Sequence, residues 1–280
     1  MTKKEIYVQK SSSETELFSK EKLALSLERS GANKDEIKTI LDKINIDIYD
    51  GISTNEIYKK AFSFLKKVNH LSASKYSLKR AIFDLGPTGF PFERLVAALL
   101  REKGFKTKVG VILNGACVTH EIDVLAEKDE TIYAVECKFH SDPRAVSNVK
   151  IPLYINSRFL DIQQHWNIIS KNSTHLKQGW LVTNTRFTKD AIQYGECIGL
   201  SLMSWDYPSG SSIKNNIDSF QLYPVTTLLN LTKEEKSILI SKNVILVKEL
   251  KENINILKIM KIDSKRISII INETNCLCNN

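Results

Sequence analysis

Residues 120–140, with the sequence HEIDVLAEKDETIYAVECKFH, predict two β-strands joined by a short polar turn. Apolar and polar residues alternate on both sides of the turn, which is typical of strands with one covered face. A two-residue turn at Asp129 and Glu130 fixes the register, because opposite residues are then counted outward from it. This count places Asp123 directly across from Glu136, with their Cβ atoms roughly 4.5 to 5.5 Å apart.

The facing acids Asp123 and Glu136 predict a metal site. Two ionised carboxylates at such a separation repel each other unless a cation neutralises them. Mg²⁺ or Mn²⁺ accepts carboxylate oxygens as ligands and keeps positions open for water. Lys138 shares the face of Glu136 and is placed to assist a water nucleophile or to stabilise a phosphate transition state. The alternative is that these residues only decorate the wet face of an antiparallel sheet, where charged pairs are ordinary.

The segments around this hairpin alternate between helices and strands. Residues 92–105, FERLVAALLREKGF, carry an apolar helical face and reach a plausible helix end at Gly104. Further strands are predicted at 106–113, 180–184 and 200–205, and further helices at 153–166 and 187–199. This order predicts an α/β fold.

Residues 90–207 resemble the PD-(D/E)XK nuclease superfamily, and most closely the Mrr-type restriction endonucleases. The D…ExK hairpin carries the resemblance, together with FERLVAALLREKGF before it and GWLVTNTRFTKDAIQYGECIGL after it. The resemblance implies an α/β/α core with a mixed sheet and Mg²⁺-dependent hydrolysis of DNA. By position it implies a helix acid at Glu93, metal ligands at Asp123 and Glu136, and a catalytic lysine at Lys138. Many Mrr-type members carry glutamine in place of Glu136, so this chain departs toward the general superfamily pattern.

His120 and His140 bracket the hairpin, but strand parity puts both on the face opposite Asp123. We therefore expect a structural or substrate-facing role for them rather than metal ligation. Cys137 has the same parity and is expected in the core, and Thr188 is expected to cap the helix that follows it. Three nearby cations are expected to be solvated charges, with phosphate contact as the alternative: Arg144, Lys150 and Arg158.

Residues 5–85 predict a short strand followed by helices, and they resemble the ATP-cone, a regulatory module that binds ATP or dATP. VQKSSSETELFSKEKL, YDGISTNEI and LSASKYSLKRAIF carry this resemblance. It implies phosphate contacts from Lys10 and Lys22, with Thr54 helping to hold the purine nucleotide. The usual basic-acidic-glycine turn of the family is replaced by KSSS, so one cation and the turn glycine are missing. The alternative is a degenerate cone that serves only in oligomerisation or docking.

The segment GPTGFP marks a border, and we predict three domains: a mostly helical ATP-cone at 1–86, the nuclease-like domain at 87–208 and a helical segment at 209–280. In the last of these, LTKEEKSILISKNVILVKEL resembles half of a helix-hairpin-helix unit. Its turn carries Asn243 where glycines normally let backbone amides approach a DNA phosphate. A structural or dimerising role is therefore favoured over DNA binding for this segment.

The charge balance agrees with a polyanionic partner. Forty Lys and Arg against thirty-two Asp and Glu give a net charge of +8, although such a surplus also occurs in proteins that are merely soluble. Five cysteines without CxxC pairs predict free thiols, and the lack of a long apolar run predicts no membrane span, so we expect a cytoplasmic protein. The sequence predicts a nucleotide-regulated, metal-dependent DNA endonuclease acting as a homo-oligomer. The alternative is a non-catalytic, nucleotide-sensing regulator that binds nucleic acid.

Overall fold

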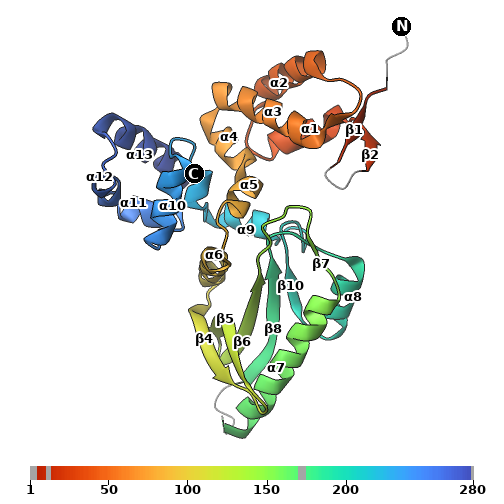
Figure 1. Cartoon of the computed structure of the whole chain (residues 1–280), viewed down its shortest axis with the longest axis vertical. Coiled ribbons are helices and arrows are strands. Elements are labelled where there is room, and N and C mark those ends of the chain that lie inside the picture. Colours follow the sequence, from red (N-terminus) through yellow and green to blue (C-terminus); the bar gives the residue numbers. More distant parts are fainter. Residues whose placement is uncertain (1–4, 11–13, 170–174, 279–280) are drawn as a thin grey trace. The chain divides into compact units, whose positions relative to one another are not determined.

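The computed structural model describes the chain over residues 5–10, 14–169 and 175–278 (Figure 1). The chain divides into two compact units. The amino-terminal unit comprises Met1–Lys79 with Thr227–Asn230, and the main unit comprises Arg80–Thr226 with Leu231–Asn280. None of the helices in the described ranges has the length and apolar character needed to cross a membrane.

The amino-terminal unit is mostly helical, with a small sheet of order β2-β1-β3. Strand β1 pairs antiparallel with β2 and parallel with β3. The strands are β1 (Tyr7–Gln9), β2 (Thr15–Leu17) and β3 (Ile52–Ser53), and the helices are α1 (Lys20–Glu28), α2 (Lys34–Asp47), α3 (Thr54–Val68) and α4 (His70–Tyr76). Buried side chains from the sheet and all four helices share one core, which includes Val8, Leu27, Ile40, Leu65 and Ala73.

Local side chains fix where these helices begin. Ser19 accepts a hydrogen bond from the backbone of Lys22 and begins α1. Helix α1 begins after Leu17, because Leu17 pairs with Tyr7 in the sheet. Helix α3 begins in the same way, since the Ser53 side chain accepts from the backbone N–H of Glu56.

The main unit is built on a five-stranded sheet of order β10-β8-β6-β5-β4. Strands β4, β5 and β6 pair antiparallel, whereas β6, β8 and β10 pair parallel, so the sheet is mixed as predicted. Its elements from the centre of the chain are α5 (Leu78–Phe83), which crosses the unit boundary, α6 (Phe90–Glu102), β4 (Lys106–Asn114), β5 (Thr119–Lys128), β6 (Thr131–Lys138), β7 (Val146–Ser147), α7 (Lys150–Ile169), β8 (His175–Thr183), β9 (Arg186–Phe187), α8 (Lys189–Cys197) and β10 (Ser201–Met203). The coarse expectation of an α/β core with a mixed sheet is confirmed.

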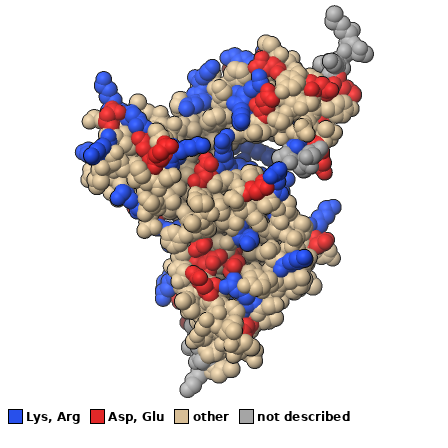
Figure 2. All heavy atoms as spheres, in the orientation of Figure 1, with Lys and Arg blue, Asp and Glu red and all other residues tan. Residues whose placement is uncertain are grey.

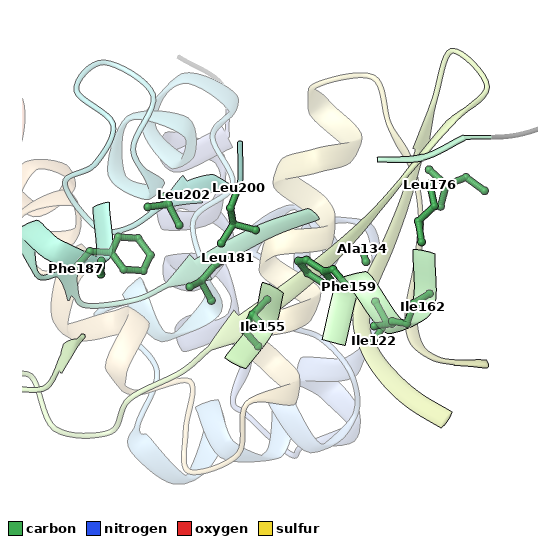
Figure 3. Close-up of a cluster of buried hydrophobic side chains, with 12 residues drawn as sticks. Ile122, Ala134, Ile155, Phe159, Ile162, Leu176, Leu181, Phe187, Leu200 and Leu202 are labelled. Atoms are coloured by element: carbon green, nitrogen blue, oxygen red, sulfur yellow. The ribbon is translucent and has the colours of Figure 1, made fainter. Parts of the chain in front are cut away.

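Helices pack on the sheet from two directions. Helix α6 contacts β4, β5 and β6 and buries its apolar face, including Leu95, Val96 and Leu99. Helix α7 lies along the sheet, and its Ile155, Phe159 and Ile162 pack with sheet residues such as Ile122, Ala134 and Leu181 (Figures 1 and 3). This burial of apolar side chains fixes both helices against the strands that carry the candidate site.

The β5–β6 hairpin has the predicted two-residue turn. Asp129 and Glu130 have φ values of 50° and 60°, the left-handed conformation that suits a tight hairpin turn. Pairing runs outward from Lys128↔Thr131 to Val124↔Val135, the register counted from the sequence. Asp123 follows directly after this last pair.

The carboxy-terminal part of the main unit is helical. It contains α9 (Ile213–Phe220), the short helix η1 (Val225–Thr227), α10 (Lys233–Ser241), α11 (Val247–Glu252), α12 (Asn255–Ile259) and α13 (Ser264–Cys278). Asn243 has a φ of 61° and so takes the left-handed conformation usually given to glycine. In the turn after it, the backbone N–H groups of Ile245 and Leu246 donate to Glu249, and that of Val247 donates to Tyr223. These amides are thus used within the protein.

Candidate active site

Asp123 lies where strand β5 becomes irregular. The β4–β5 ladder passes from Val109↔Val124 to Val111↔Ile122 without a pair at Asp123, and Gly110 of β4 has a φ of 65°. The Asp123 carboxylate instead accepts a hydrogen bond of 2.6 Å from the backbone N–H of Cys137 on β6. Burial raises the pKa of Asp123, while this hydrogen bond opposes the rise. The acid is therefore fixed to the neighbouring strand.

Glu136 lies on β6, next in sequence to Cys137. Burial raises its pKa to about 7, and the charge of Asp123 adds to this effect. The guanidinium of Arg158 opposes the rise, because its Nη1 lies 2.7 Å from Oε2 of Glu136. The two predicted metal ligands thus lie close enough for the charge of Asp123 to raise the pKa of Glu136.

Glu93 reaches the same region from the first turn of α6. Burial raises its pKa to about 7, and the charges of Asp123 and Glu121 add to the rise. The chain enters this turn through Gly89, where a Cβ would lie 3.2 Å from Oε1 of Glu93. The absence of a side chain at Gly89 leaves room for the Glu93 carboxyl.

Lys138 is the last residue of β6 and is exposed. Its charge lowers the pKa values of both Asp123 and Glu136, so its ammonium group lies within electrostatic reach of both acids. The structure therefore brings together all four residues that the sequence singled out for chemistry. Acidic side chains gather over α6 and the neighbouring ends of the strands, with Lys and Arg beside them (Figure 2).

Arg158 is a site residue that was not predicted from the sequence. It was expected to be a solvated charge, but its side chain is only 14% exposed and is paired with Glu136. The signal was its spacing, since Arg158 falls between Ile155, Phe159 and Ile162 on the buried face of α7. A cation on that face meets the sheet rather than solvent.

The residues around the hairpin support its ends. The His120 ring lies 2.7 Å from Asp161 of α7, which agrees with the structural role expected for that histidine. Buried Asn184 accepts from the backbone N–H of His140 and donates to its carbonyl, joining the chain after β6 to the end of β8. Thr188 caps α8 as predicted, by accepting from the backbone of Ala191.

Asp123 and Glu136 offer carboxylate oxygens as possible ligands for a divalent cation. No group of three or more His, Cys, Asp or Glu side chains is arranged as a metal site within the described ranges. The chemistry of the two acids fits a hard cation, because both offer carboxylate oxygens and the pKa of each is raised by burial in a shared acidic environment. A bound cation would relieve their repulsion.

The residues proposed for nucleotide contact also lie close together. The Nζ atoms of Lys10 and Lys22 each lie 3.0 Å from the carboxylate of Glu16. Thr54 begins α3 directly after Ser53, which pairs with Gln9 beside Lys10. The rest of the predicted KSSS turn, Ser11 to Ser13, lies outside the described residues.

Comparison with known proteins supports the central part of this assignment. Residues 87–206 match the family model Mrr_cat, described as restriction endonuclease, and residues 223–278 match the model described as AF1548-like, C-terminal. The first match supports the PD-(D/E)XK-like core and a nuclease-like function.

The matching curated protein and the matching solved structure carry no assigned function. An uncharacterized protein of Archaeoglobus fulgidus is 41% identical over 139 residues, which cover 50% of this chain and 74% of that protein. The crystal structure of AF1548, a protein of unknown function, superimposes with a TM-score of 0.54 at 32% identity, covering 69% of this chain and 100% of that one. The chain therefore belongs to the family of this Archaeoglobus fulgidus protein, and two of its segments match the restriction endonuclease model and the AF1548-like C-terminal model.

Proposed function

We propose that this protein is a metal-dependent DNA endonuclease that hydrolyses phosphodiester bonds, in restriction or in defence against foreign DNA. The observation that carries the proposal is the convergence of Glu93, Asp123, Glu136 and Lys138 at one end of a mixed sheet. These residues come from a helix and two strands of the segment that matches a restriction endonuclease model. The match alone supports a nuclease-like function, and the convergence supports catalysis.

Each residue has a role in this proposal. Asp123 and Glu136 would hold Mg²⁺ or Mn²⁺, which supplies an activated water and neutralises charge on the phosphate. The Cys137 N–H keeps the Asp123 carboxylate in place. Glu93, with a pKa near 7, supports the two ligands and can hold a proton near neutral pH. Lys138 is exposed beside both acids, where it can orient the nucleophile and stabilise developing negative charge.

We further propose that residues 1–86 form a nucleotide-binding domain of the ATP-cone type, followed by the nuclease domain at 87–208 and the helical segment at 209–280. The convergence of Lys10 and Lys22 on Glu16 supports this, because two ammonium groups held together can bind the phosphates of ATP or dATP. The nucleotide would act by changing the population of a cytoplasmic homo-oligomer. A degenerate cone used for docking is the alternative, given the substitution KSSS.

The second candidate is a non-catalytic, nucleotide-sensing regulator that only grips nucleic acid. The ion pair between Arg158 and Glu136 favours it, because a guanidinium already neutralises one of the two acids. Cleavage separates the candidates. Supercoiled plasmid is incubated with Mg²⁺ or Mn²⁺, with and without ATP or dATP, and DNA binding is measured in parallel. We expect nicked and linear products that require metal, whereas tight binding without cleavage under any of these conditions would favour the regulator.

A further inference from the structure

Arg158 holds three partners at once from its position on α7. Its Nη1 donates to Oε2 of Glu136, its Nη2 donates to the backbone carbonyl of Glu121, and its guanidinium lies 5.6 Å from the centre of the Tyr154 ring. The neighbouring residues Ile155 and Phe159 are buried. The guanidinium is therefore aimed at the ends of β5 and β6 by a helix that the core holds in place.

The arginine acts on both acids of the candidate metal site. It pairs directly with Glu136, and its charge also lowers the pKa of Asp123. Both side chains of the ion pair are largely buried, at 14% and 17% exposure, where charge interactions are screened less than at the surface. A divalent cation ligated by the same acids would meet a positive charge already in place and a Glu136 oxygen already engaged.

We propose that Arg158 is a positioning residue that orients Glu136 and competes with the divalent cation for its carboxylate. This inference rests on the proposed metal-dependent function. The planar guanidinium reaches β5 and β6 together, so it fixes the spacing of the strand ends as well as the Glu136 side chain. To bind the cation, Glu136 must then either release Arg158 or share its carboxylate between Arg158 and the cation. Either change lowers the affinity of the site for metal.

The test measures cation binding directly, without DNA and without turnover. Mn²⁺ is titrated calorimetrically into wild type, Arg158→Met, Arg158→Lys and Arg186→Met at pH 8.5, where protons compete least with the metal. Arg186 is a matched control, because it pairs with Asp206 at the surface and its loss removes the same charge outside the acidic cluster. Circular dichroism and thermal unfolding establish that each variant is folded.

We expect Arg158→Met to bind Mn²⁺ about tenfold more tightly than wild type, a modest effect for removing a charge from a partly buried site. Arg158→Lys should lie in between, since one ammonium cannot hold Glu136 and the Glu121 carbonyl as the fork does. Arg186→Met should match wild type. Without metal, Arg158→Met should unfold at a lower temperature, and Mn²⁺ should raise its midpoint more than that of wild type.

Unchanged or weaker Mn²⁺ binding by Arg158→Met would overturn the proposal, because a purely structural arginine predicts that result. If this variant does not fold, Arg158→Lys decides in the same way. Asp123→Ala separates this inference from the function on which it rests. Suppose that wild type binds Mn²⁺, that Asp123→Ala abolishes this binding and that Arg158→Met does not strengthen it. This result overturns the role of Arg158 and leaves the metal site in place. If wild type does not bind Mn²⁺, the metal-dependent function is overturned, and so is the proposed competition between Arg158 and the cation.

Discussion

The backbone N–H of Cys137 donates a hydrogen bond of 2.6 Å to Oδ2 of Asp123, so an acid on β5 is held by the main chain of β6 between Glu136 and Lys138. Asp123 is consequently located by a backbone group that every substitution at Cys137 except proline leaves in place. Its carboxylate also interacts with the charges of Lys138 and Arg158. The position of the Asp123 carboxylate therefore depends on a backbone group, whereas its charge interactions depend on side chains. Substitutions can change the charge of the site without changing this position.

Asp123→Ala and Lys138→Ala should each reduce plasmid cleavage by at least about 10²-fold, because each removes a charge from the reacting centre. Asp123→Asn is the sharper variant, since its amide oxygen can still accept from the Cys137 N–H while the negative charge is lost. Nicking rates and gel-shift affinities are measured side by side. DNA binding and unfolding temperature should stay close to wild type, and full cleavage by any of these variants would contradict the assignment.

Glu93 should make the metal-free protein lose stability as the pH rises. Its pKa is raised from 4.5 to about 7, so the folded state binds its proton more tightly than the unfolded state. The resulting stabilisation is complete below pH 4.5 and disappears as the pH rises through about 7. Glu93→Gln should therefore raise the unfolding temperature at pH 8 and change it little at pH 5.

Exposed Glu127 on β5 provides the matched control for this measurement. Glu127→Gln should give the same small change at both pH values. Equal effects of Glu93→Gln on the unfolding temperature at pH 5 and pH 8 would show that the surroundings of Glu93 do not raise its pKa. Binding of the divalent cation should also weaken below about pH 7, because protons compete with it for Glu93 and Glu136 there.

Two glycines before α6 should be sensitive to added methyl groups for different reasons. A Cβ at Gly86 would lie 2.9 Å from the Phe139 ring, so Gly86→Ala should cost about 1–3 kcal/mol in free energy of unfolding. A Cβ at Gly89 would instead lie 3.2 Å from Oε1 of Glu93, which can move. Gly89→Ala should thus lower the cleavage rate several-fold with a smaller loss of stability. Urea unfolding and nicking assays compare the two, and an inactive but fully stable Gly86→Ala would reverse this interpretation.

Nucleotide sensitivity should depend on the two lysines that meet at Glu16. Lys10→Ala/Lys22→Ala should abolish ATP and dATP binding in calorimetry and leave a constant basal nuclease rate. Lys66→Ala/Lys67→Ala removes two charges from the exposed end of α3 and should bind nucleotide as wild type does. If wild type binds no purine nucleotide, the amino-terminal unit is a degenerate cone, and the role left for it is docking or oligomerisation.

The parts of the site that could be predicted are those fixed by local sequence. The turn at Asp129 and Glu130 sets the register by itself, so the pairing from Lys128↔Thr131 to Val124↔Val135 follows from counting residues, although the ladder ends before the predicted Asp123–Glu136 pair. The short strands β2 and β3 were missed, because two or three residues cannot show an alternation. Their pairing with β1 is decided by tertiary structure.

The partnership of Arg158 could not be predicted in the same way. Helical spacing marks it as a buried position, but only the packing of α7 on the sheet shows that a carboxylate lies opposite. The missing pair at Asp123 in the β4–β5 ladder could not be predicted either, because burial in β5 alternates without interruption through that residue. Such an irregularity depends on the pairing of two strands, and it leaves no mark in the alternation of apolar and polar residues in either sequence.

The mixed sheet also sets an order of assembly. Strands β5 and β6 are joined by two residues, so this hairpin can close on a timescale of about 1–10 μs. Parallel pairing of β6 with β8 must wait until the crossover through α7 is in place, since its contacts are distant in sequence. The two acids therefore meet while Arg158 is still far from them. Early in folding their repulsion opposes the hairpin, and a divalent cation present at that time would speed its closure.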